Sequence, residues 1–316
     1  MSTILVTGAS GFVGSHAVPE LLRAGHRVVA LARTPTAGER IVERLPADLR
    51  SSVEIRTGDV TRPDTLGPAV DGVDGVLHLV AIPRDFNNGA DLRLINTEGT
   101  RSLVAALKAA GVARLVHMGA MGVRDDPDLH YASSKAKAEA IVAGSGLEWT
   151  ILKPSLQFGP GDGFFNIIAD LVRLSPGLVP VPGDGRSRFQ PIHVEDVARI
   201  VRMAFEDGTT VGQMLELGGP RYVTYREITS AVLRALGKRR AIVPMPVPLI
   251  KLVARTSELV RLPLPVASDQ LRQLRFDNIG PLGLILSRFG FDPRDLDGNL
   301  GYLRLSRREQ QASVRA

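Results

Sequence analysis

The chain contains no cysteine among its 316 residues. This absence excludes disulfide bonds, thiol nucleophiles, cysteine-ligated zinc and iron–sulfur clusters. Aromatic residues make up only 5%, with one Trp and four Tyr, which argues against a surface for stacking single-stranded nucleic acid. No run of about 18 apolar residues occurs, so we expect no membrane-spanning helix. The N-terminus has no basic region followed by an apolar run, and we therefore expect a cytoplasmic protein without a signal peptide.

The composition is that of a folded globular chain, with 44% hydrophobic and 23% charged residues. The net charge of +6 arises entirely in the second half. Residues 1–155 hold 17 basic and 17 acidic side chains, whereas residues 156–316 hold 22 and 16. We interpret this excess as a solvated face and a frayed end, with peripheral contact to a membrane or a membrane complex as the alternative. The basic residues are densest at Arg234, Lys238, Arg239, Arg240, Arg304, Arg307, Arg308 and Arg315.

Short apolar runs alternate with helical stretches through most of the chain. Runs that are apolar on both faces are typical of strands buried in a parallel sheet. The sequence therefore predicts an α/β fold built on a doubly wound parallel sheet. The expected strands are Thr3–Thr7, Val28–Ala32, Val53–Thr57, Gly75–Leu79, Arg114–Met118, Glu148–Lys153 and Gln213–Leu217. The expected helices include Thr100–Ala110, Ser134–Ala143, Val194–Phe205 and Thr224–Leu236, the last with a T-x-x-E capping box.

A glycine-rich segment with the spacing G-x-x-G-x-x-G follows the first expected strand, at Gly8, Gly11 and Gly14. Such glycines allow a sharp turn, a close backbone approach to a pyrophosphate, and close packing of the next helix. The amides at the start of that helix would face the phosphates. The position between a strand and a helix favours a dinucleotide site over a turn without a ligand.

The residues after the second expected strand indicate which nucleotide is bound. An NAD site usually has an acidic residue there for the ribose hydroxyls, but this chain has Arg33 and Thr34. An arginine can bind a 2′-phosphate, and a threonine can add a hydroxyl donor. We therefore expect NADP(H) to be preferred over NAD(H), unless Arg33 pairs with an acid of the next helix.

Tyr131 and Lys135 are four residues apart and would share one face of a helix. A nearby ammonium group lowers the pKa of a phenol. Such a tyrosine can donate a proton to a carbonyl oxygen during hydride transfer, or remove one in the reverse direction.

Several motifs together resemble the extended or atypical short-chain dehydrogenase/reductase superfamily, the NAD-dependent epimerase/dehydratase type with a Rossmann-type fold. They are TGASGFVG from Thr7, Gly58-Asp-Val60, His78-Leu-Val-Ala81, Asn96-Thr-Glu-Gly-Thr100, YASSK from Tyr131, and LKPSLQFGP from Leu152. Three further motifs resemble bacterial relatives of the nucleotide-binding accessory subunit of respiratory complex I. They are FQPIHVEDV from Phe189, Gly218-Gly-Pro220 and Thr224-Tyr-Arg-Glu227.

The resemblance implies roles for individual residues. Asp59 and Val60 would flank the adenine, and Ala81 would line the nicotinamide side. Lys135 would also bind the nicotinamide ribose. The pyrophosphate would lie on Gly8, Ser10, Gly11, Phe12, Val13 and Gly14, and Pro154 and Ser155 would pass beside the nicotinamide.

One departure from the superfamily pattern concerns catalysis. Active members usually carry a Ser or Thr after the fifth strand, but no Ser or Thr occurs between Ser102 and Ser133. Losing one such hydrogen-bond donor typically costs about 10²–10³ in rate. His117 and His130 are possible substitutes, although we interpret them as a packed histidine and a helix-start residue.

The resemblance also implies a smaller C-terminal substrate domain. We expect the dinucleotide-binding domain at 1–155 and 187–217, the substrate domain at 156–186 and 218–305, and a flexible tail at 306–316. Proline and glycine predict irregular structure over Pro176–Gly185, and Val243–Pro248 is too rich in proline for a central strand. Pro244–Pro265 contains an amphipathic helix, which we interpret as packed on the substrate domain rather than on a membrane or over a lipophilic substrate.

Two functions remain open from the sequence. The first is an NADPH-dependent oxidoreductase or epimerase acting on a small or lipophilic carbonyl or hydroxyl compound, with Tyr131 as acid/base. The second is a non-catalytic NADPH-binding accessory or assembly protein of a membrane-associated complex. Nucleic-acid binding is not expected, and neither is a metal site, because His193 and Asp196 lack a third ligand and are interpreted as a structural turn.

Overall fold

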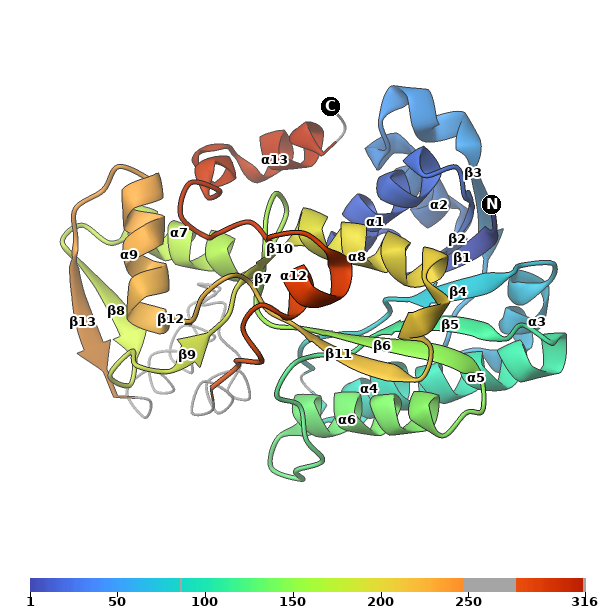
Figure 1. Cartoon of the computed structure of the whole chain (residues 1–316). Coiled ribbons are helices and arrows are strands. Elements are labelled where there is room, and N and C mark those ends of the chain that lie inside the picture. Colours follow the sequence, from blue (N-terminus) through green and yellow to red (C-terminus); the bar gives the residue numbers. More distant parts are fainter. Residues whose placement is uncertain (86, 247–276, 315–316) are drawn as a thin grey trace.

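A seven-stranded parallel sheet forms the centre of the protein (Figure 1). The structure is a computed structural model and describes residues 1–85, 87–246 and 277–314. The strand order is β11-β6-β5-β4-β1-β2-β3, and it reverses between β1 and β4, as in a doubly wound fold. The predicted fold class is confirmed. The strands are β1 (Thr3–Thr7), β2 (Arg27–Ala32), β3 (Val53–Thr57), β4 (Gly75–His78), β5 (Arg114–Met118), β6 (Glu148–Pro154) and β11 (Gln213–Leu217).

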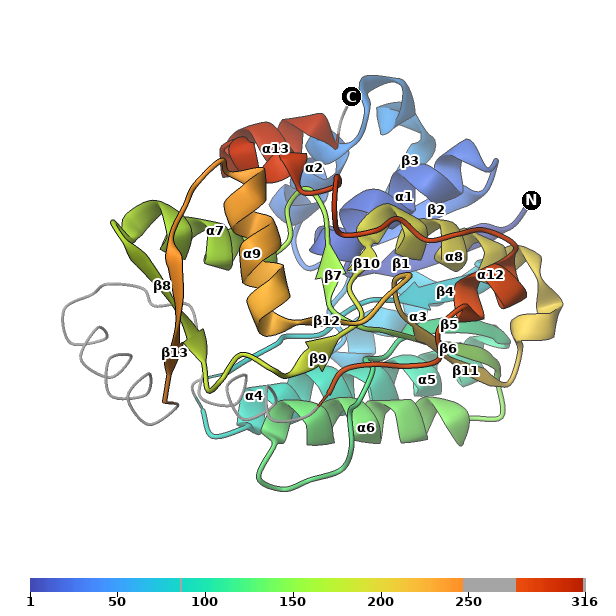
Figure 2. The ribbon, with the colours of Figure 1, turned by 60° about the vertical axis from the view of Figure 1, so that its left-hand side comes forward.

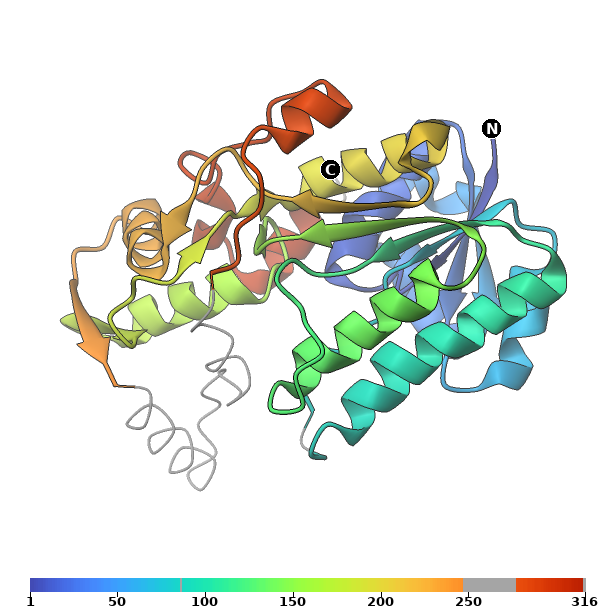
Figure 3. The same cartoon turned by 60° about the horizontal axis from the view of Figure 1, so that its bottom comes forward.

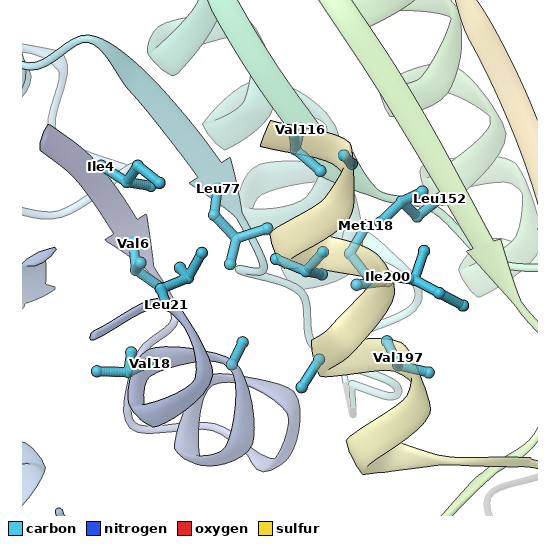
Figure 4. Packing of buried hydrophobic residues seen from close by; sticks show 14 of the residues in the cluster. Ile4, Val6, Val18, Leu21, Leu77, Val116, Met118, Leu152, Val197 and Ile200 are labelled. Atoms are coloured by element: carbon cyan, nitrogen blue, oxygen red, sulfur yellow. The ribbon is translucent and has the colours of Figure 1, made fainter. Parts of the chain in front are cut away.

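Helices cover both faces of this sheet (Figure 3). Alternate residues of β1 face opposite ways: Ile4 and Val6 pack in one buried cluster, and Leu5 packs in another. Figure 4 shows the first cluster, in which Leu21 and Ile200 come from two helices on the same face. That face is covered by α1 (Phe12–Arg23), α2 (Pro35–Arg44) and α8 (Val194–Glu206), and the other by α3 (Leu66–Val70), α5 (Gly99–Ala110) and α6 (His130–Ala143).

A second hydrophobic core lies beside the sheet domain, on the left in Figure 1. It is built by α7 (Phe164–Leu174), α9 (Tyr225–Ala235) and the short helix η5 (Gly301–Arg304). The predicted capping box is present at the start of α9, where Thr224 and Glu227 bond reciprocally. The remaining short helices are η1 (Ala47–Ser52), η2 (Pro63–Thr65), α4 (Ala90–Leu92), the π-helix η3 (Arg93–Glu98), η4 (Gly208–Thr210) and α12 (Leu284–Phe289).

Two proline-containing segments form strands. β8 (Leu178–Pro182) pairs in parallel with β13 (Ala241–Met245), so the prediction of irregular structure over Pro176–Gly185 is wrong. The pair forms a sheet of its own, in which each strand has one unpaired edge that tolerates a residue without an N–H group. The amphipathic helix expected within Pro244–Pro265 lies, from residue 247 on, outside the described residues. The other short strands are β7 (Gln157–Phe158), β9 (Arg188–Phe189), β10 (Ile192–His193) and β12 (Val223–Thr224).

The C-terminal segment is helical rather than the flexible tail predicted from its polar composition. α13 (Arg307–Ser313) begins with a capping box formed by Ser306 and Glu309. Gln310 is fully buried, donates a 2.8 Å hydrogen bond to Asn166 Oδ1 and accepts one of 3.1 Å from the Gly161 amide. One buried amide side chain therefore anchors the helix. Among the described residues, no helix is long and apolar enough to cross a membrane.

Candidate functional site

The glycine-rich loop connects β1 to α1 at the carboxyl edge of the sheet. Gly8 has φ +73°, a left-handed conformation that favours glycine. A Cβ atom on Gly14 would lie 2.5 Å from the Gly8 carbonyl oxygen and 2.6 Å from that of Ala9. No side chain caps α1, and its first turn has no acidic residue. The loop therefore fits a diphosphate, which the free amides at the start of α1 would bind.

The other predicted pyrophosphate residues lie around the same turn. Ser10 and Gly11 are exposed, whereas Phe12 and Val13 begin α1 and are half-buried. Arg44, which the sequence did not single out, comes from the end of α2, and its Nη1 donates a 2.7 Å hydrogen bond to the Ser10 carbonyl oxygen. The contact spans 34 residues, so only the folded chain brings this cation to the loop.

Arg33 and Thr34 follow β2 and are exposed. The Thr34 hydroxyl caps α2 by accepting a 3.2 Å hydrogen bond from the Ala37 amide. Within the described part of the chain, the Arg33 guanidinium has no hydrogen-bond or ion-pair partner. It is therefore available for an anionic group and does not pair with an acid of α2.

The residues predicted to flank the adenine and nicotinamide lie at the ends of β3 and β4. Asp59 Oδ1 accepts hydrogen bonds from the Thr61 amide (2.9 Å) and hydroxyl (2.8 Å), so Asp59 shapes a turn. Val60 is buried. Ala81 is exposed beyond the end of β4.

Tyr131 and Lys135 lie in the first half of α6. Lys135 is 3% exposed, and its Nζ donates a 2.5 Å hydrogen bond to the Met118 carbonyl oxygen at the end of β5. Burial lowers the pKa of Lys135 to about 8, although nearby Glu139 opposes the shift. Burial, reinforced by the Glu139 carboxylate, raises the pKa of Tyr131 to about 12. The sequence predicted a lowered phenol pKa; burial dominates instead, and Tyr131 carries its proton at neutral pH.

Gly119 and Ala120 directly follow β5, in the stretch that contains no Ser or Thr. A Cβ atom on Gly119 would lie 2.5 Å from Glu139 Oε1, so the Glu139 carboxylate fills this space. Glu139 is held in place by a 3.0 Å ion pair with Lys153 and a 3.1 Å hydrogen bond from the Ala120 amide. Ala120 lines the cavity described below. Of these two positions, only 120 could carry a hydroxyl toward the cavity without meeting the Glu139 carboxylate.

Neither histidine considered as a substitute lines that cavity. His117 is fully buried in β5, and neither of its ring nitrogens has a hydrogen-bond partner among the described residues. Burial holds the pKa of His117 well below its usual value. His130 is the first residue of α6, as its interpretation as a helix-start residue predicted.

A cavity of about 520 Å³ lies between the sheet domain and the second core. Tyr131, Pro154 and Ser155 are part of its wall, and the Ser155 hydroxyl donates a 2.5 Å hydrogen bond to Asn278 Oδ1. The exposed Arg84 also lines the cavity and has no ion-pair partner among the described residues. The other polar side chains of the described wall are Arg124, Gln157 and Asp277. Most of the rest of the described wall is apolar: Phe12, Met121, Leu129, Leu156, Phe164, Ile167, Ile168, Phe189 and Tyr225.

The His193 and Asp196 pair has structural partners. His193 precedes α8, and its Nδ1 accepts a 3.3 Å hydrogen bond from the Glu195 amide. Asp196 Oδ2 accepts a 2.7 Å hydrogen bond from the Arg294 amide, which ties the C-terminal segment to α8. These hydrogen bonds are consistent with a structural role for the pair. The described residues contain no group of three or more His, Asp or Glu side chains that could hold a metal ion.

Comparisons with known proteins agree with this geometry. The chain is 25% identical over 295 residues to NADH dehydrogenase [ubiquinone] 1 alpha subcomplex subunit 9, mitochondrial, of Arabidopsis thaliana, covering 92% of this chain and 73% of that protein. It is 29% identical over 252 residues to a ceramide reductase of Caulobacter vibrioides, covering 78% and 74%.

Among solved structures, the UDP-glucose 4-epimerase of Thermus thermophilus in complex with NAD has the same fold. The TM-score is 0.71 at 23% identity, over 98% of this chain and 99% of that one. The sequence model of the NAD dependent epimerase/dehydratase family matches residues 4–218. The chain therefore belongs to the NAD dependent epimerase/dehydratase family, and its nucleotide is a nicotinamide dinucleotide.

Proposed function

We propose that this protein is an NADP(H)-dependent oxidoreductase that reduces a lipophilic carbonyl compound. One observation carries the proposal: the protonated Tyr131 lies in the wall of a largely apolar cavity of about 520 Å³ that also reaches Phe12 of the glycine-rich loop. An epimerase of sugar nucleotides would need many polar partners for hydroxyl groups. The apolar wall favours a hydrocarbon-rich substrate instead.

The cofactor would supply the hydride, and the chain would bind, orient and move the proton. Tyr131 would donate its phenolic proton to the carbonyl oxygen of the substrate. The Lys135 ammonium, held by the Met118 carbonyl, would orient the nicotinamide ribose and stabilise the phenolate that remains. The raised pKa of Tyr131 keeps the phenol in its protonated form at neutral pH, which is the form that a proton donor needs.

The preference for NADP(H) rests on the residues after β2. Arg33 has no partner among the described residues, and no acidic residue takes its place at the ribose. A guanidinium group can bind a 2′-phosphate in a bidentate manner. Arg33 is therefore the expected 2′-phosphate contact.

The Tyr131→Phe variant tests catalysis. With NADPH and a panel of long-chain ketones, we expect kcat/KM to fall about 10²–10⁴-fold because the proton donor is lost. NADPH affinity measured by calorimetry should not change. Tyr222→Phe is the matched control, because its hydroxyl bonds the Gly280 carbonyl outside the cavity wall. Equal rates for wild type and Tyr131→Phe across the panel would refute the oxidoreductase proposal.

A second candidate function is a non-catalytic NADPH-binding accessory protein. Glu139 fills the space of one possible catalytic hydroxyl, and Ala120 offers no hydroxyl at the other position. The relative in Arabidopsis is named as a subunit of NADH dehydrogenase. This function predicts NADPH that co-purifies and raises the melting temperature but is not oxidised with any member of the ketone panel.

A further inference from the structure

Basic residues of the C-terminal half lie at the C-terminal ends of the three helices that build the second core, α7 and α9 (Figure 2) and η5. Arg240 Nε donates a 2.8 Å hydrogen bond to the Ser175 carbonyl oxygen, and Arg304 Nε donates one of 2.7 Å to that of Ala235. These bonds hold together three segments, which we call the basic end: residues 173–178, 234–241 and 303–308.

The basic end has an unbalanced charge. Its three segments contain eight basic residues and no Asp or Glu: Arg173, Arg234, Lys238, Arg239, Arg240, Arg304, Arg307 and Arg308. Three neighbouring carboxylates partly compensate them. Glu309 follows the third segment directly and accepts a 2.7 Å hydrogen bond from the Ser306 amide. Asp170 pairs with Arg173 and Arg307, and Asp297 pairs with Arg234. The other five cations have no carboxylate partner in the part of the chain that the structure describes.

Two leucines protrude among these cations. Leu174 ends α7 and is 82% exposed, and Leu178 begins β8 and is 52% exposed. Ser175, Pro176 and Gly177 form the connection between them. Single exposed leucines are common on protein surfaces. A pair on one connection, next to cations without a carboxylate partner, is the combination that binds a surface with an apolar layer beneath an anionic one.

We propose that the basic end docks on the surface of a bilayer containing anionic lipids. The cations without a carboxylate partner would bind lipid phosphates, and Leu174 and Leu178 would enter the boundary of the acyl chains. The charge alone would also suit nucleic acid. However, the three segments contain no aromatic residue on which a base could stack.

The basic end is also connected to the cavity. α7 begins at Phe164 in the cavity wall and ends at Leu174, ten residues or about 15 Å away. Docking would therefore hold the apolar cavity close to the bilayer. The surface is proposed independently of turnover, because none of its residues lines the cavity.

Vesicle sedimentation tests the proposal with the full chain. We expect the protein to pellet with vesicles of phosphatidylcholine containing 30% phosphatidylglycerol, roughly the anionic content that attracts basic surfaces. It should stay in solution with phosphatidylcholine alone, and 0.5 M salt, roughly a fivefold shorter screening range than at low salt, should weaken binding. No binding to the anionic vesicles would overturn the proposal.

Matched variants assign the binding to this surface. Each basic residue near an anionic membrane contributes roughly fivefold to partitioning, so Lys238→Gln/Arg239→Gln should weaken it about 25-fold. Arg27→Gln/Lys108→Gln removes two exposed cations elsewhere and should have a smaller effect. Leu174→Ser/Leu178→Ser should weaken binding roughly tenfold, because apolar burial is lost, whereas Leu286→Ser, which is 49% exposed on α12, should not.

Two other outcomes would overturn the proposal. One is equal loss in the Lys238/Arg239 and Arg27/Lys108 variants, which would mean that only net charge matters. The other is patch-dependent binding to a heparin or polyglutamate column without binding to anionic vesicles, which would indicate an acidic polymer as the partner. Melting temperatures of all variants should lie close to wild type, since each changed side chain is exposed.

Discussion

The sheet domain and the C-terminal region differ in net charge and in where their apolar side chains lie. The sheet domain is electrically neutral up to residue 155 and buries its apolar strands beneath helices on both faces. The residues proposed to bind the cofactor lie at the carboxyl edge of its strands. The C-terminal region carries the whole net charge, contributes much of an apolar cavity wall, and leaves four leucines exposed among its described residues: Leu174, Leu178, Leu282 and Leu286.

Because of this difference, we expect the two regions to bind different partners: the nucleotide in one, and the substrate or a surface in the other. The glycine-rich loop and, in the proposed NADP(H) site, Arg33 would bind a nucleotide that is common to many reactions, so they contain little information about the substrate. Information about the substrate or a partner surface lies instead in the cavity wall from α7 and β9 and in the proposed basic end. The contrast predicts that changes in one region should alter nucleotide binding, and changes in the other should alter substrate or surface binding.

The largest expected effect lies in the nucleotide loop. Gly14→Ala places a Cβ atom 2.5–2.7 Å from the backbone of Gly8 and Ala9, which cannot move without disrupting β1 or α1. We expect NADPH affinity by calorimetry to fall more than about 100-fold, and stability to fall by about 1–3 kcal/mol. Gly67→Ala is the control, because no heavy atom lies within 4 Å of its Cβ position. Unchanged NADPH affinity in Gly14→Ala would contradict the assigned loop.

A pH-dependent effect is expected in the second core. Asp162 is 1% exposed and accepts a 2.6 Å hydrogen bond from the Tyr302 hydroxyl. Burial raises the pKa of Asp162 from 3.8 to about 6. The folded state then binds the proton more tightly than the unfolded state does. The stabilising contribution of the protonated carboxyl is complete below about pH 4 and is lost as pH rises through 6, by about 3 kcal/mol.

Urea unfolding at pH 4.5 and pH 7 measures this contribution. Relative to the Asp162→Asn variant, wild type should be more stable at pH 4.5 than at pH 7. The difference between their free energies of unfolding should therefore decrease as the pH rises. Asp64→Asn, at an exposed position, should leave the difference constant. A pH-independent difference for Asp162→Asn would mean that this carboxyl titrates alike in the folded and unfolded states.

Cofactor preference should change with Arg33. Arg33→Asp places a carboxylate near the 2′-phosphate, and we expect the ratio of NADPH to NADH affinity to fall about 30-fold, within the range of lost charged hydrogen bonds. Arg40→Asp changes an exposed charge later on α2 and controls for long-range electrostatics. An unchanged ratio in Arg33→Asp would remove Arg33 from the site.

The smallest expected effect is an increase in the turnover rate. Ala120→Ser places a hydroxyl in the cavity wall, whereas Gly119→Ser would collide with Glu139. If Tyr131 acts as the proton donor, the added hydrogen-bond donor should raise kcat by about tenfold, a fraction of what one such donor contributes elsewhere. Gly119→Ser should give no gain. No turnover in either variant with the ketone panel would favour the accessory function.

Local sequence patterns were sufficient to predict much of the fold. All seven central strands begin and end within one residue of the predicted bounds, because buried parallel strands are apolar on both faces. The capping boxes of α9 and α13 are both short sequence motifs. Only the first was predicted, because the polar composition of 306–316 suggested a flexible tail. β8 was missed because prolines normally exclude a strand, and its edge position depends on a partner 63 residues away.

The site likewise contains some residues that the sequence predicts and others that only the folded chain brings together. The glycine spacing, Arg33, Tyr131 and Lys135 are local motifs whose chemistry is visible in sequence. Arg44 on the loop and the apolar wall of the cavity are not, because they join segments that are remote along the chain. The direction of the Tyr131 pKa shift also depended on burial, which a four-residue spacing does not contain.

The sequence by itself determined the doubly wound fold, the family and the kind of nucleotide that this family uses, since each rests on periodicity or a contiguous motif. The tertiary structure alone decided that Glu139 fills the space beside Gly119, that Tyr131 stays protonated, and that the C-terminal charges converge around two exposed leucines. The physical reason is that desolvation, steric exclusion and charge clustering are properties of distances between atoms, and those distances exist only in the folded chain.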